Sequence, residues 1–139
     1  MKNILIIDDD TSVCLLLEEI LSKKYAVYSC KNAMDALCWL TDGNLPDVIV
    51  TDVVMPALTG VELLEKLRES ALFKSIPVII LSGLEDPEKR KRSLELGAHA
   101  FLLKPFSPES LLQMIDEVAD DDENESVITF NDNLYAKGN

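Results

Sequence analysis

The chain has 139 residues, of which 47% are hydrophobic, and 25 acidic against 13 basic side chains give it a formal net charge of −12. This length and apolar content suit one domain with one well-formed core and leave no room for a second domain. The negative charge argues against direct binding to nucleic acid or to an anionic membrane surface. Because no apolar run approaches the roughly 20 residues of a membrane span, and no signal-peptide pattern opens the chain, we expect a cytoplasmic protein.

The first predicted element is a buried strand at residues 4–7, a continuous apolar run that ends abruptly in Asp8, Asp9 and Asp10. Helical spacing of apolar residues then predicts a helix over about residues 12–24. Its expected inward positions are Val13, Leu16, Leu17, Ile20 and Leu21. Since Asp10 begins the loop into this helix, we interpret it as a helix cap.

A β-rich run at residues 25–29 predicts a second strand, and residues 33–40 have helical spacing. The central strand is predicted at residues 48–51, where four β-branched residues lead directly to Asp52. A carboxylate at the end of a buried strand is costly to desolvate and adds nothing to a core. Asp52 is therefore expected to have a function or a charged partner.

The remaining elements alternate in the same way. They are a helix over about 61–70, strand 76–81, helix 87–96, strand 100–103 and a helix from 107 with Leu111, Leu112, Ile115 and Val118 inward. Ser82 follows the fourth strand and Lys104 follows the fifth. The helix at 87–96 has few apolar residues and a basic cluster from Lys89 to Arg92, so we expect it to be the least firmly packed.

This β-α alternation predicts a doubly wound, three-layer α/β domain over residues 1–119, with helices on both faces of a parallel five-stranded sheet. Residues 120–139 differ in composition and open with an acidic block at 120–125, so we expect a mobile acidic tail or linker. Residues 127–130 could add a short strand or open a further domain.

Several reactive or aromatic side chains have plain structural interpretations. The cysteines Cys14, Cys30 and Cys38 are odd in number, lack C-x-x-C spacing and lie in apolar surroundings, so reduced buried thiols are expected. His99 is interpreted as an exposed loop residue and Trp39 as a partly buried helix residue.

The polar residues at the strand ends form the candidate site. In a parallel sheet the carboxyl ends of the strands share one edge, which brings together Asp8, Asp9, Asp52, Ser82 and Lys104. Three converging carboxylates repel one another, and Mg²⁺ would relieve that repulsion while leaving room for phosphate oxygens. With a hydroxyl and an ammonium group added, the set could hold a transferring phosphoryl group from several sides.

In this arrangement, residues 4–107 resemble the receiver domain of the two-component response-regulator family. The matching motifs are the run Ile4 to Asp10, Asp52 with Met55-Pro56 and Gly60, Ser82-Gly83, Gly97-Ala98, and Lys104-Pro105-Phe106. Each motif is weak alone, whereas all of them in order and at the right spacing are highly specific. The resemblance implies a flavodoxin-like fold with strand order 2-1-3-4-5.

The resemblance also implies roles for the site residues. Asp52 would be the nucleophile that takes a phosphoryl group from a sensor histidine kinase or a phosphotransfer protein, and Lys104 would pair with Asp52 and then with the phosphoryl oxygens. Asp8 and Asp9 would hold Mg²⁺, with contributions from Asp52 and the backbone carbonyl of Val54. The protein would catalyse its own phosphorylation and slow dephosphorylation, and would not be an enzyme in the usual sense.

The implied output is a two-state switch. Ser82 would swing toward the phosphoryl group and Phe101 would turn inward behind it, altering the face formed by the fourth helix, the last strand and the fifth helix. Because no DNA-binding helix-turn-helix or catalytic effector follows, the receiver would act through a downstream protein or an output domain outside this chain. Homodimerisation through the same face stays open.

The sequence departs from the common family pattern at a few positions. Ser82 stands where many receivers have Thr, and Phe101 stands where many have Tyr. Val54 and Leu84, two residues after the acceptor and two after the hydroxyl residue, are apolar and offer no group to position an attacking water. We therefore hypothesise a long-lived phosphorylated form.

Two alternatives come from other functional classes. The spacing of Asp8 and Asp10 after an apolar strand also fits a phosphohydrolase of the haloacid-dehalogenase type, with Asp8 as nucleophile and Asp10 as acid/base. Those enzymes need a late acidic motif where this chain has Lys104-Pro105. The other alternative is a phosphate-independent interaction module, although such a module would have no use for three clustered carboxylates.

Overall fold

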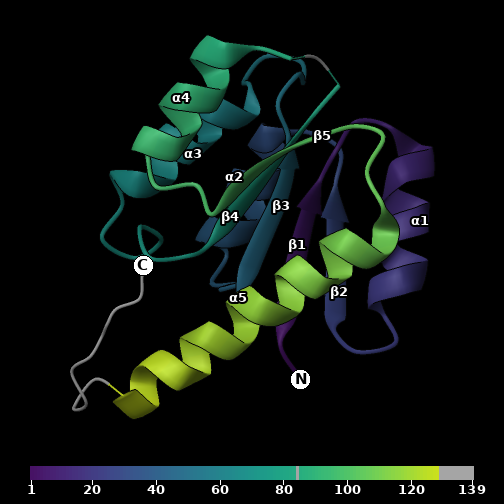
Figure 1. The fold of residues 1–139 in the computed structure, drawn as a ribbon. Helices are drawn as coiled ribbons and strands as arrows, with labels where there is room; N and C mark the ends of the chain where they lie inside the picture. Colours follow the sequence, from purple (N-terminus) through teal and green to yellow (C-terminus); the bar gives the residue numbers. More distant parts are fainter. Residues whose placement is uncertain (84, 129–139) are drawn as a thin grey trace.

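The computed structural model describes residues 1–83 and 85–128. Its strands and helices follow the predicted alternation (Figure 1). In chain order they are β1 (Asn3–Ile7), α1 (Thr11–Leu21), β2 (Ala26–Cys30), α2 (Ala33–Thr41), β3 (Val48–Asp52), α3 (Gly60–Arg68), β4 (Val78–Ser82), α4 (Pro87–Glu95), β5 (Ala100–Leu103) and α5 (Pro108–Ile128).

The strands form one parallel sheet in the order β2-β1-β3-β4-β5, which confirms the predicted doubly wound topology. β3 is central and buried along its whole length, as its β-branched run predicts. The register places Ile7 beside Thr51 and Asp52 beside Leu81. The loops that follow β1, β3 and β4 therefore begin at the same edge of the sheet.

Alternate residues of each central strand feed two hydrophobic cores, one on each face of the sheet. From β1, Leu5 and Ile7 join the core beneath α2 and α3, whereas Ile4 and Ile6 join the core beneath α1 and α5. α4 packs beside α3 and β5. Of the residues in α4, Ser93 alone is buried, which agrees with the expectation of weak packing.

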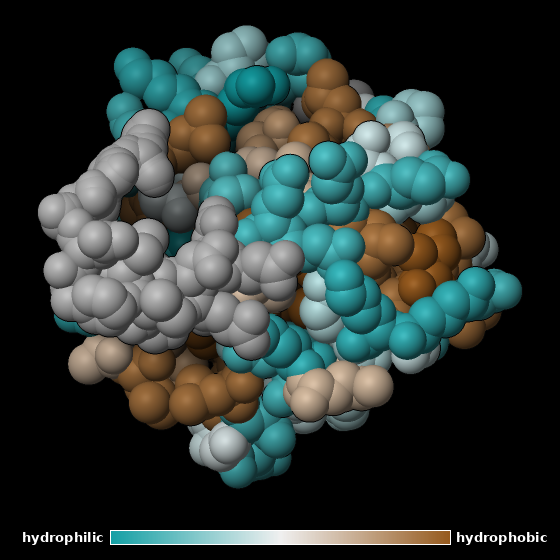
Figure 2. Space-filling model, turned by 60° about the horizontal axis from the view of Figure 1, so that its bottom comes forward, coloured by the Kyte–Doolittle hydropathy of each residue, from teal (hydrophilic) through white to brown (hydrophobic). Residues whose placement is uncertain are grey.

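The inward face of α1 differs from the predicted stripe. The buried positions are Cys14, Leu17 and Leu21, whereas Leu16 is 46% exposed and its neighbour Leu15 is 59% exposed. The predicted inward position of Leu16 is thus wrong, because a helix that packs at the rim of a sheet buries a narrower stripe than its apolar content allows. Hydrophobic areas interrupt the hydrophilic surface in Figure 2, one of them on the side where Figure 1 shows α1.

α5 continues to Ile128, beyond the domain boundary expected at residue 119. Its inward residues Leu111, Ile115 and Val118 are buried as predicted. Val127 and Ile128 lie in this helix and not in a strand, while the rest of the predicted tail, residues 129–139, lies outside the described residues. Across the described part of the chain, the helices are too short or too polar to cross a membrane.

The three cysteines do not share one environment. Cys14 and Cys30 are buried, whereas Cys38 is exposed, so the prediction of a buried thiol is wrong there. Cys38 lies on the outer side of α2 because Ala36 and Leu40 turn inward.

We expect Cys38 to be the one thiol that reacts rapidly with iodoacetamide in the native protein at pH 8, because Cys14 and Cys30 are buried. Burial raises the pKa of Cys30 to about 11, so its thiolate fraction at that pH is only about 0.1%. Burial, followed by the charge of Asp8, also raises the pKa of Cys14. Mass spectrometry should show that Cys38→Ser removes the rapid phase of alkylation. Rapid alkylation of two or more thiols in the wild type would contradict this prediction.

Candidate functional site

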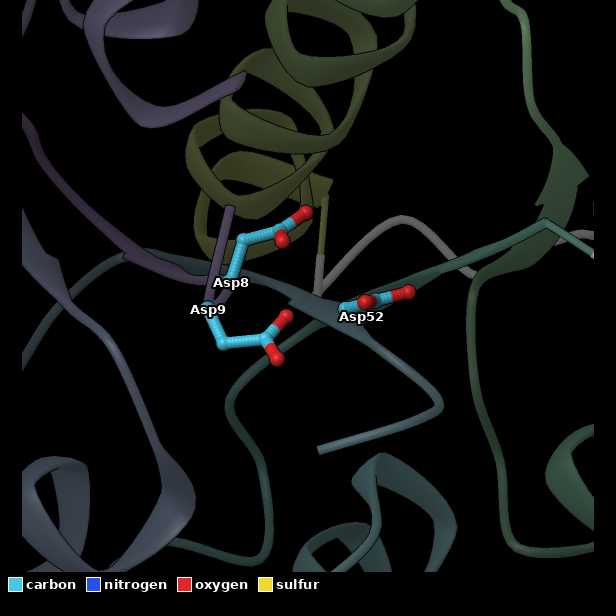
Figure 3. A group of neighbouring side chains, drawn as sticks. All are labelled: Asp8, Asp9 and Asp52. Carbon is cyan, nitrogen blue, oxygen red and sulfur yellow. The ribbon is translucent and has the colours of Figure 1, made fainter. Parts of the chain in front are cut away.

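Three carboxylates converge at the carboxyl edge of the sheet (Figure 3). Asp8 and Asp9 follow β1, and Asp52 is the last residue of β3. One oxygen from each carboxylate lies within 4.8 Å of the others. Asp8 and Asp52 are buried while Asp9 is exposed, so the cluster opens to solvent on the side of Asp9.

Asp8 is held from several directions. Its Oδ1 accepts a hydrogen bond from the backbone N–H of Asp10 at 2.9 Å, and its Oδ2 lies 3.0 Å from Nζ of Lys104. Its backbone carbonyl accepts from the Cys14 thiol at 3.3 Å, and its backbone N–H donates to the carbonyl of Cys30 at 3.1 Å. These contacts fix a carboxylate that is only 1% exposed.

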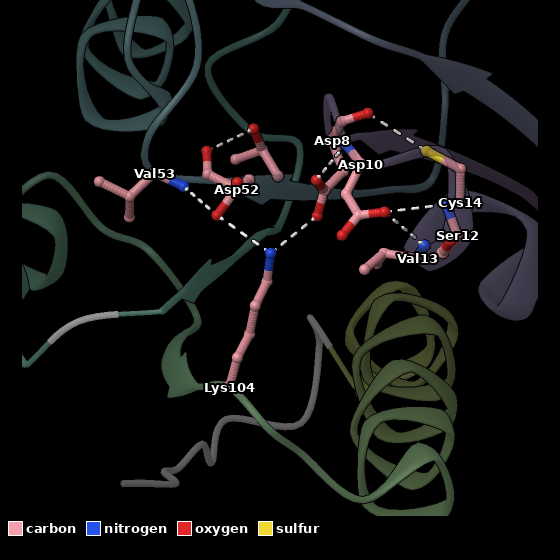
Figure 4. Close-up of polar contacts among 9 residues, drawn as sticks. Asp8, Asp10, Ser12, Val13, Cys14, Asp52, Val53 and Lys104 are labelled. Carbon is pink, nitrogen blue, oxygen red and sulfur yellow. Dashed lines mark hydrogen bonds and ion pairs between the residues drawn. The ribbon is translucent and has the colours of Figure 1, made fainter.

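Asp52 is 7% exposed, and its Oδ1 has two partners, a backbone N–H and a lysine ammonium (Figure 4). The backbone N–H of Val53 donates to this oxygen at 2.9 Å, and Nζ of Lys104 lies 3.4 Å away. Burial and the nearby charge of Asp8 raise the pKa of Asp52, and Lys104 with Val53 partly offsets that rise. Asp52 is therefore a carboxyl group that has little access to water and lies beside the negative charge of Asp8.

Lys104 bridges the two buried carboxylates. Burial by itself would lower its pKa, but the hydrogen bond and charge of Asp8, together with Asp52, outweigh burial and raise it. Its backbone N–H donates to the carbonyl of Ser82 at 2.7 Å, which ties the end of β5 to the end of β4. The ammonium group is thus held in its charged form beside Asp52.

The predicted switch residues lie on the strands next to this cluster. Ser82 ends β4, is 2% exposed and follows Leu81, the register partner of Asp52. Phe101 on β5 is 6% exposed, so an inward turn would start from a ring that is already largely buried. Val54, two residues after Asp52, is 61% exposed. Leu84 lies outside the described residues.

Asp10 and His99 have the structural roles predicted for them. The Asp10 carboxylate caps α1 by accepting from the backbone N–H groups of Ser12 and Val13, at 2.9 and 3.4 Å. A carboxylate engaged in this way is not placed as the acid/base of a phosphohydrolase. His99 is exposed, as expected.

Sequence reasoning missed the supports behind the cluster. The Cys14 thiol holds the Asp8 carbonyl, and the Thr51 hydroxyl donates to the Asp52 carbonyl at 3.1 Å. The residue types of Cys14 and Thr51 do not indicate these hydrogen bonds, since a buried Cys and a strand Thr are ordinary core residues. The proximity of both to a predicted site residue was the one available signal.

Comparisons with known proteins agree with this geometry. A receiver domain protein described as CheY-like, from Methanospirillum hungatei JF-1, superposes with a TM-score of 0.84 at 32% identity, covering 90% of this chain and 98% of that one. The chemotaxis response regulator CheY4 of Vibrio cholerae superposes with a TM-score of 0.77, also at 32% identity, covering 85% of this chain and 98% of that one. Over 119 residues the chain is 39% identical to the two-component response regulator ORR6 of Oryza sativa subsp. japonica, covering 84% of this chain and 70% of that protein.

The family model for the response regulator receiver domain matches residues 4–116. The chain belongs to this family. The match spans both cores and the acidic edge of the sheet, so the resemblance seen in the sequence is confirmed. Membership also removes the basis for a haloacid-dehalogenase phosphohydrolase.

The donor set of this receiver domain fits Mg²⁺. Three carboxylates within 4.8 Å of one another are hard oxygen donors, and the exposure of Asp9 leaves access for water and for a phosphate-bearing ligand. Asp8, Asp9 and Asp52 would hold the ion, while the Val54 carbonyl as a further ligand stays a prediction. When bound, Mg²⁺ would supply charge neutralisation for phosphate oxygens at this edge.

The raised pKa of Asp52 predicts an effect of pH on the stability of the receiver domain. A carboxyl group whose pKa is higher in the folded state destabilises that state at neutral pH, and the penalty disappears as pH falls through the two pKa values. Asp52→Asn should therefore raise Tm by a few degrees at pH 7 in EDTA. Calorimetry should show the difference shrinking toward pH 4; a constant difference would contradict it.

Proposed function

We propose that this chain is a cytoplasmic signalling switch that accepts a phosphoryl group on Asp52 from a sensor histidine kinase or a phosphotransfer protein. The observation that supports it is the placement of Asp52, a buried carboxylate 3.4 Å from Nζ of Lys104 and beside the carboxylates of Asp8 and Asp9. Each of these groups has a use in phosphoryl transfer, and together they have little use in a core.

The proposed step is an in-line substitution at phosphorus. A carboxylate oxygen of Asp52 forms the new P–O bond as the bond from phosphorus to the donor breaks, and the donor leaves with the electron pair. The donor bond is P–N for a phosphohistidine and P–O for acetyl phosphate. Lys104 stabilises the charge on the transferring oxygens, and Asp8 and Asp9 would hold Mg²⁺, which would neutralise further charge on the phosphoryl group.

The proposed output follows from the neighbours of Asp52. A phosphoryl group there offers new acceptor oxygens, to which the hydroxyl of Ser82 would move, while Phe101 would adjust behind it on β5. The surface of α4, β5 and α5 would change as a result. A downstream protein, an output domain outside this chain or a second copy of the chain would read that change.

The test is intact mass after incubation with Mg²⁺ and acetyl phosphate. We expect the wild type to gain one phosphoryl group and Asp52→Asn to gain none. Asp42→Asn, which changes an exposed acidic residue at the end of α2, is the matched control and should be labelled like the wild type. Absence of labelling in all three, with Mg²⁺ binding intact, would instead favour a phosphate-independent interaction module.

The phosphorylated form is expected to be long-lived. Val54 presents an exposed apolar side chain beside the acceptor and cannot orient an attacking water. Val54→Asn should speed loss of the phosphoryl group by up to about 10²-fold, within the range for a positioned polar group in hydrolysis. Decay can be followed by mass after removal of acetyl phosphate. Rapid decay of the wild type with Mg²⁺ and no phosphatase would refute the prediction.

A further inference from the structure

The start of α3 touches the backbone of the acceptor residue. Gly60, the first residue of α3, is buried, and a Cβ added to it would lie 2.1 Å from the carbonyl oxygen of Asp52. The same Cβ would lie 3.0 Å from the Asp52 carbonyl carbon and 3.2 Å from Cα of Val53. Since the φ of Gly60 is not left-handed, glycine is required here for space and not for its backbone freedom.

All three contacts fall on one peptide unit, the one that joins Asp52 to Val53. The N–H of this unit is the Val53 donor that binds Oδ1 of Asp52 at 2.9 Å and also reaches the carbonyl of Leu81 at 3.0 Å. Its carbonyl accepts from the Thr51 hydroxyl at 3.1 Å. The N–H and C=O of a planar peptide move together, so pressure on the carbonyl also turns the N–H.

A second contact holds the start of α3 against the segment that follows β3. The backbone N–H of Gly60 donates to the carbonyl of Val53 at 2.9 Å. The preceding residue, Thr59, caps α3 in a capping box with Glu62, which holds the helix end in place. The helix cannot withdraw from the Asp52–Val53 peptide without losing the hydrogen bond from Gly60 to Val53.

We infer that Gly60 is a positioning residue, whose missing side chain lets α3 clamp the Asp52–Val53 peptide and so aims the Asp52 carboxylate at Lys104 and the acidic cluster. The inference rests on the proposed phosphorylation of Asp52 and adds a residue that touches neither phosphate nor metal. A side chain at position 60 rotates this peptide, shifts the Val53 N–H and misaligns the acceptor oxygen.

The test compares Gly60→Ala with a variant that is destabilised elsewhere. We expect Gly60→Ala to lower the phosphorylation rate constant with acetyl phosphate at saturating Mg²⁺ by about 10- to 100-fold, the typical cost of a misplaced reacting group. The Mg²⁺ affinity, measured by NMR titration, should weaken by about 10-fold or more, as when an outer support of a metal ligand is removed. Leu40→Ala, in the core beneath α2, should lower Tm without changing either quantity.

The readouts separate positioning from loss of fold. Partial unfolding reduces the amplitude of labelling, whereas mispositioning reduces the rate constant of the folded fraction. If Gly60→Ala does not fold, Thr51→Val loosens the same peptide from its other side, and its rate constant should fall by about 2- to 10-fold, the value of one hydrogen bond. Wild-type rate constants in the folded variant would overturn the inference.

Failure of this inference can be told apart from failure of the proposed function. If the wild type takes no phosphoryl group, the proposed function fails, and the Mg²⁺ titration still decides the role of Gly60. If the wild type is labelled and Gly60→Ala matches it in rate and in Mg²⁺ affinity, this inference alone fails. A wild type that neither binds Mg²⁺ nor is labelled overturns both.

Discussion

Lys104→Met is expected to slow phosphorylation of Asp52 by about 10²- to 10³-fold, the usual cost of removing one preorganised group that stabilises transition-state charge. Nζ of Lys104 lies 3.0 Å from Asp8 and 3.4 Å from Asp52, so it stands where the oxygens of a phosphoryl group on Asp52 would gather. Methionine keeps most of the length of the side chain and removes its charge. Stopped reactions with acetyl phosphate, analysed by intact mass, would give the rate constant.

The same change should affect stability in a way that depends on Mg²⁺. Without Lys104, two buried carboxylates lose their common cation, and we expect a loss of about 1–3 kcal/mol in EDTA, less than for a fully buried pair because the lysine is partly exposed. Saturating Mg²⁺ should restore much of this loss, since an ion that binds only the folded state stabilises it by mass action.

Lys91→Met provides the control for Lys104→Met, because Lys91 is an exposed lysine of α4 and is not one of the residues of the acidic cluster. Its phosphorylation rate and its Mg²⁺ dependence should match those of the wild type. Lys104→Arg keeps the charge but replaces a compact ammonium with a planar fork, so an intermediate rate is expected. A Lys104→Met rate close to that of the wild type would contradict the role assigned to the ammonium.

Most of the fold and of the acidic cluster could be predicted because buried parallel strands have a simple signature. The runs at residues 4–7 and 76–81 are continuously apolar, and the run at 48–51 is wholly β-branched. Each leads into a polar residue, and parallel strands place those ends at one edge. That single geometric rule brings Asp8 and Asp52 together without any knowledge of their side-chain positions. The structure then places one oxygen of each carboxylate within 4.8 Å of the other, in agreement with the shared edge.

What could not be predicted depends on helix rotation and on contacts through space. The exposure of Leu16 and Cys38 follows from a rotation of α1 and α2 that apolar spacing alone does not determine, because several of their neighbours are equally hydrophobic. The close approach of Gly60 to Asp52 joins a helix start to a strand end across a loop. A glycine at a helix start is otherwise read as a simple punctuation signal.

Arg68 is the clearest case of a structural residue that periodicity does not reveal, and Arg68→Met is expected to lower the free energy of unfolding by about 2–4 kcal/mol. Its Nε donates to the carbonyl of Leu96 at 2.8 Å, and its Nη2 donates to that of Gly97 at 3.1 Å. Its Nη1 donates to the carbonyls of Lys74 and Ile76, both at 3.0 Å. One guanidinium therefore joins the end of α3 to the segment before β4 and to the turn before β5.

The size of the expected loss in stability of Arg68→Met follows from the burial of the guanidinium and the number of carbonyls it binds. Burial removes part of the hydration of the Arg68 guanidinium and so lowers the pKa of Arg68. Its hydrogen bonds to backbone carbonyls replace the lost contacts with water. Methionine would fill much of the space of the aliphatic stem but leave those carbonyls without their donor. Because some of the carbonyls are exposed, water replaces part of the loss, and the expected cost stays below the sum of the separate bonds.

Arg92→Met separates this role from the effect of removing any arginine. Nη2 of Arg92 lies 3.0 Å from Glu65, but both side chains are about half exposed, so its removal should cost less than about 1 kcal/mol. In urea unfolding, Arg68→Met should have a lower midpoint than Arg92→Met, while the dependence of the free energy of unfolding on urea concentration stays similar. Hydrogen exchange should also be faster in Arg68→Met at the His99 amide, which donates to the Val78 carbonyl at 2.8 Å just beyond the turn that Arg68 holds. Equal losses in both variants would show that Arg68 acts as an ordinary surface charge.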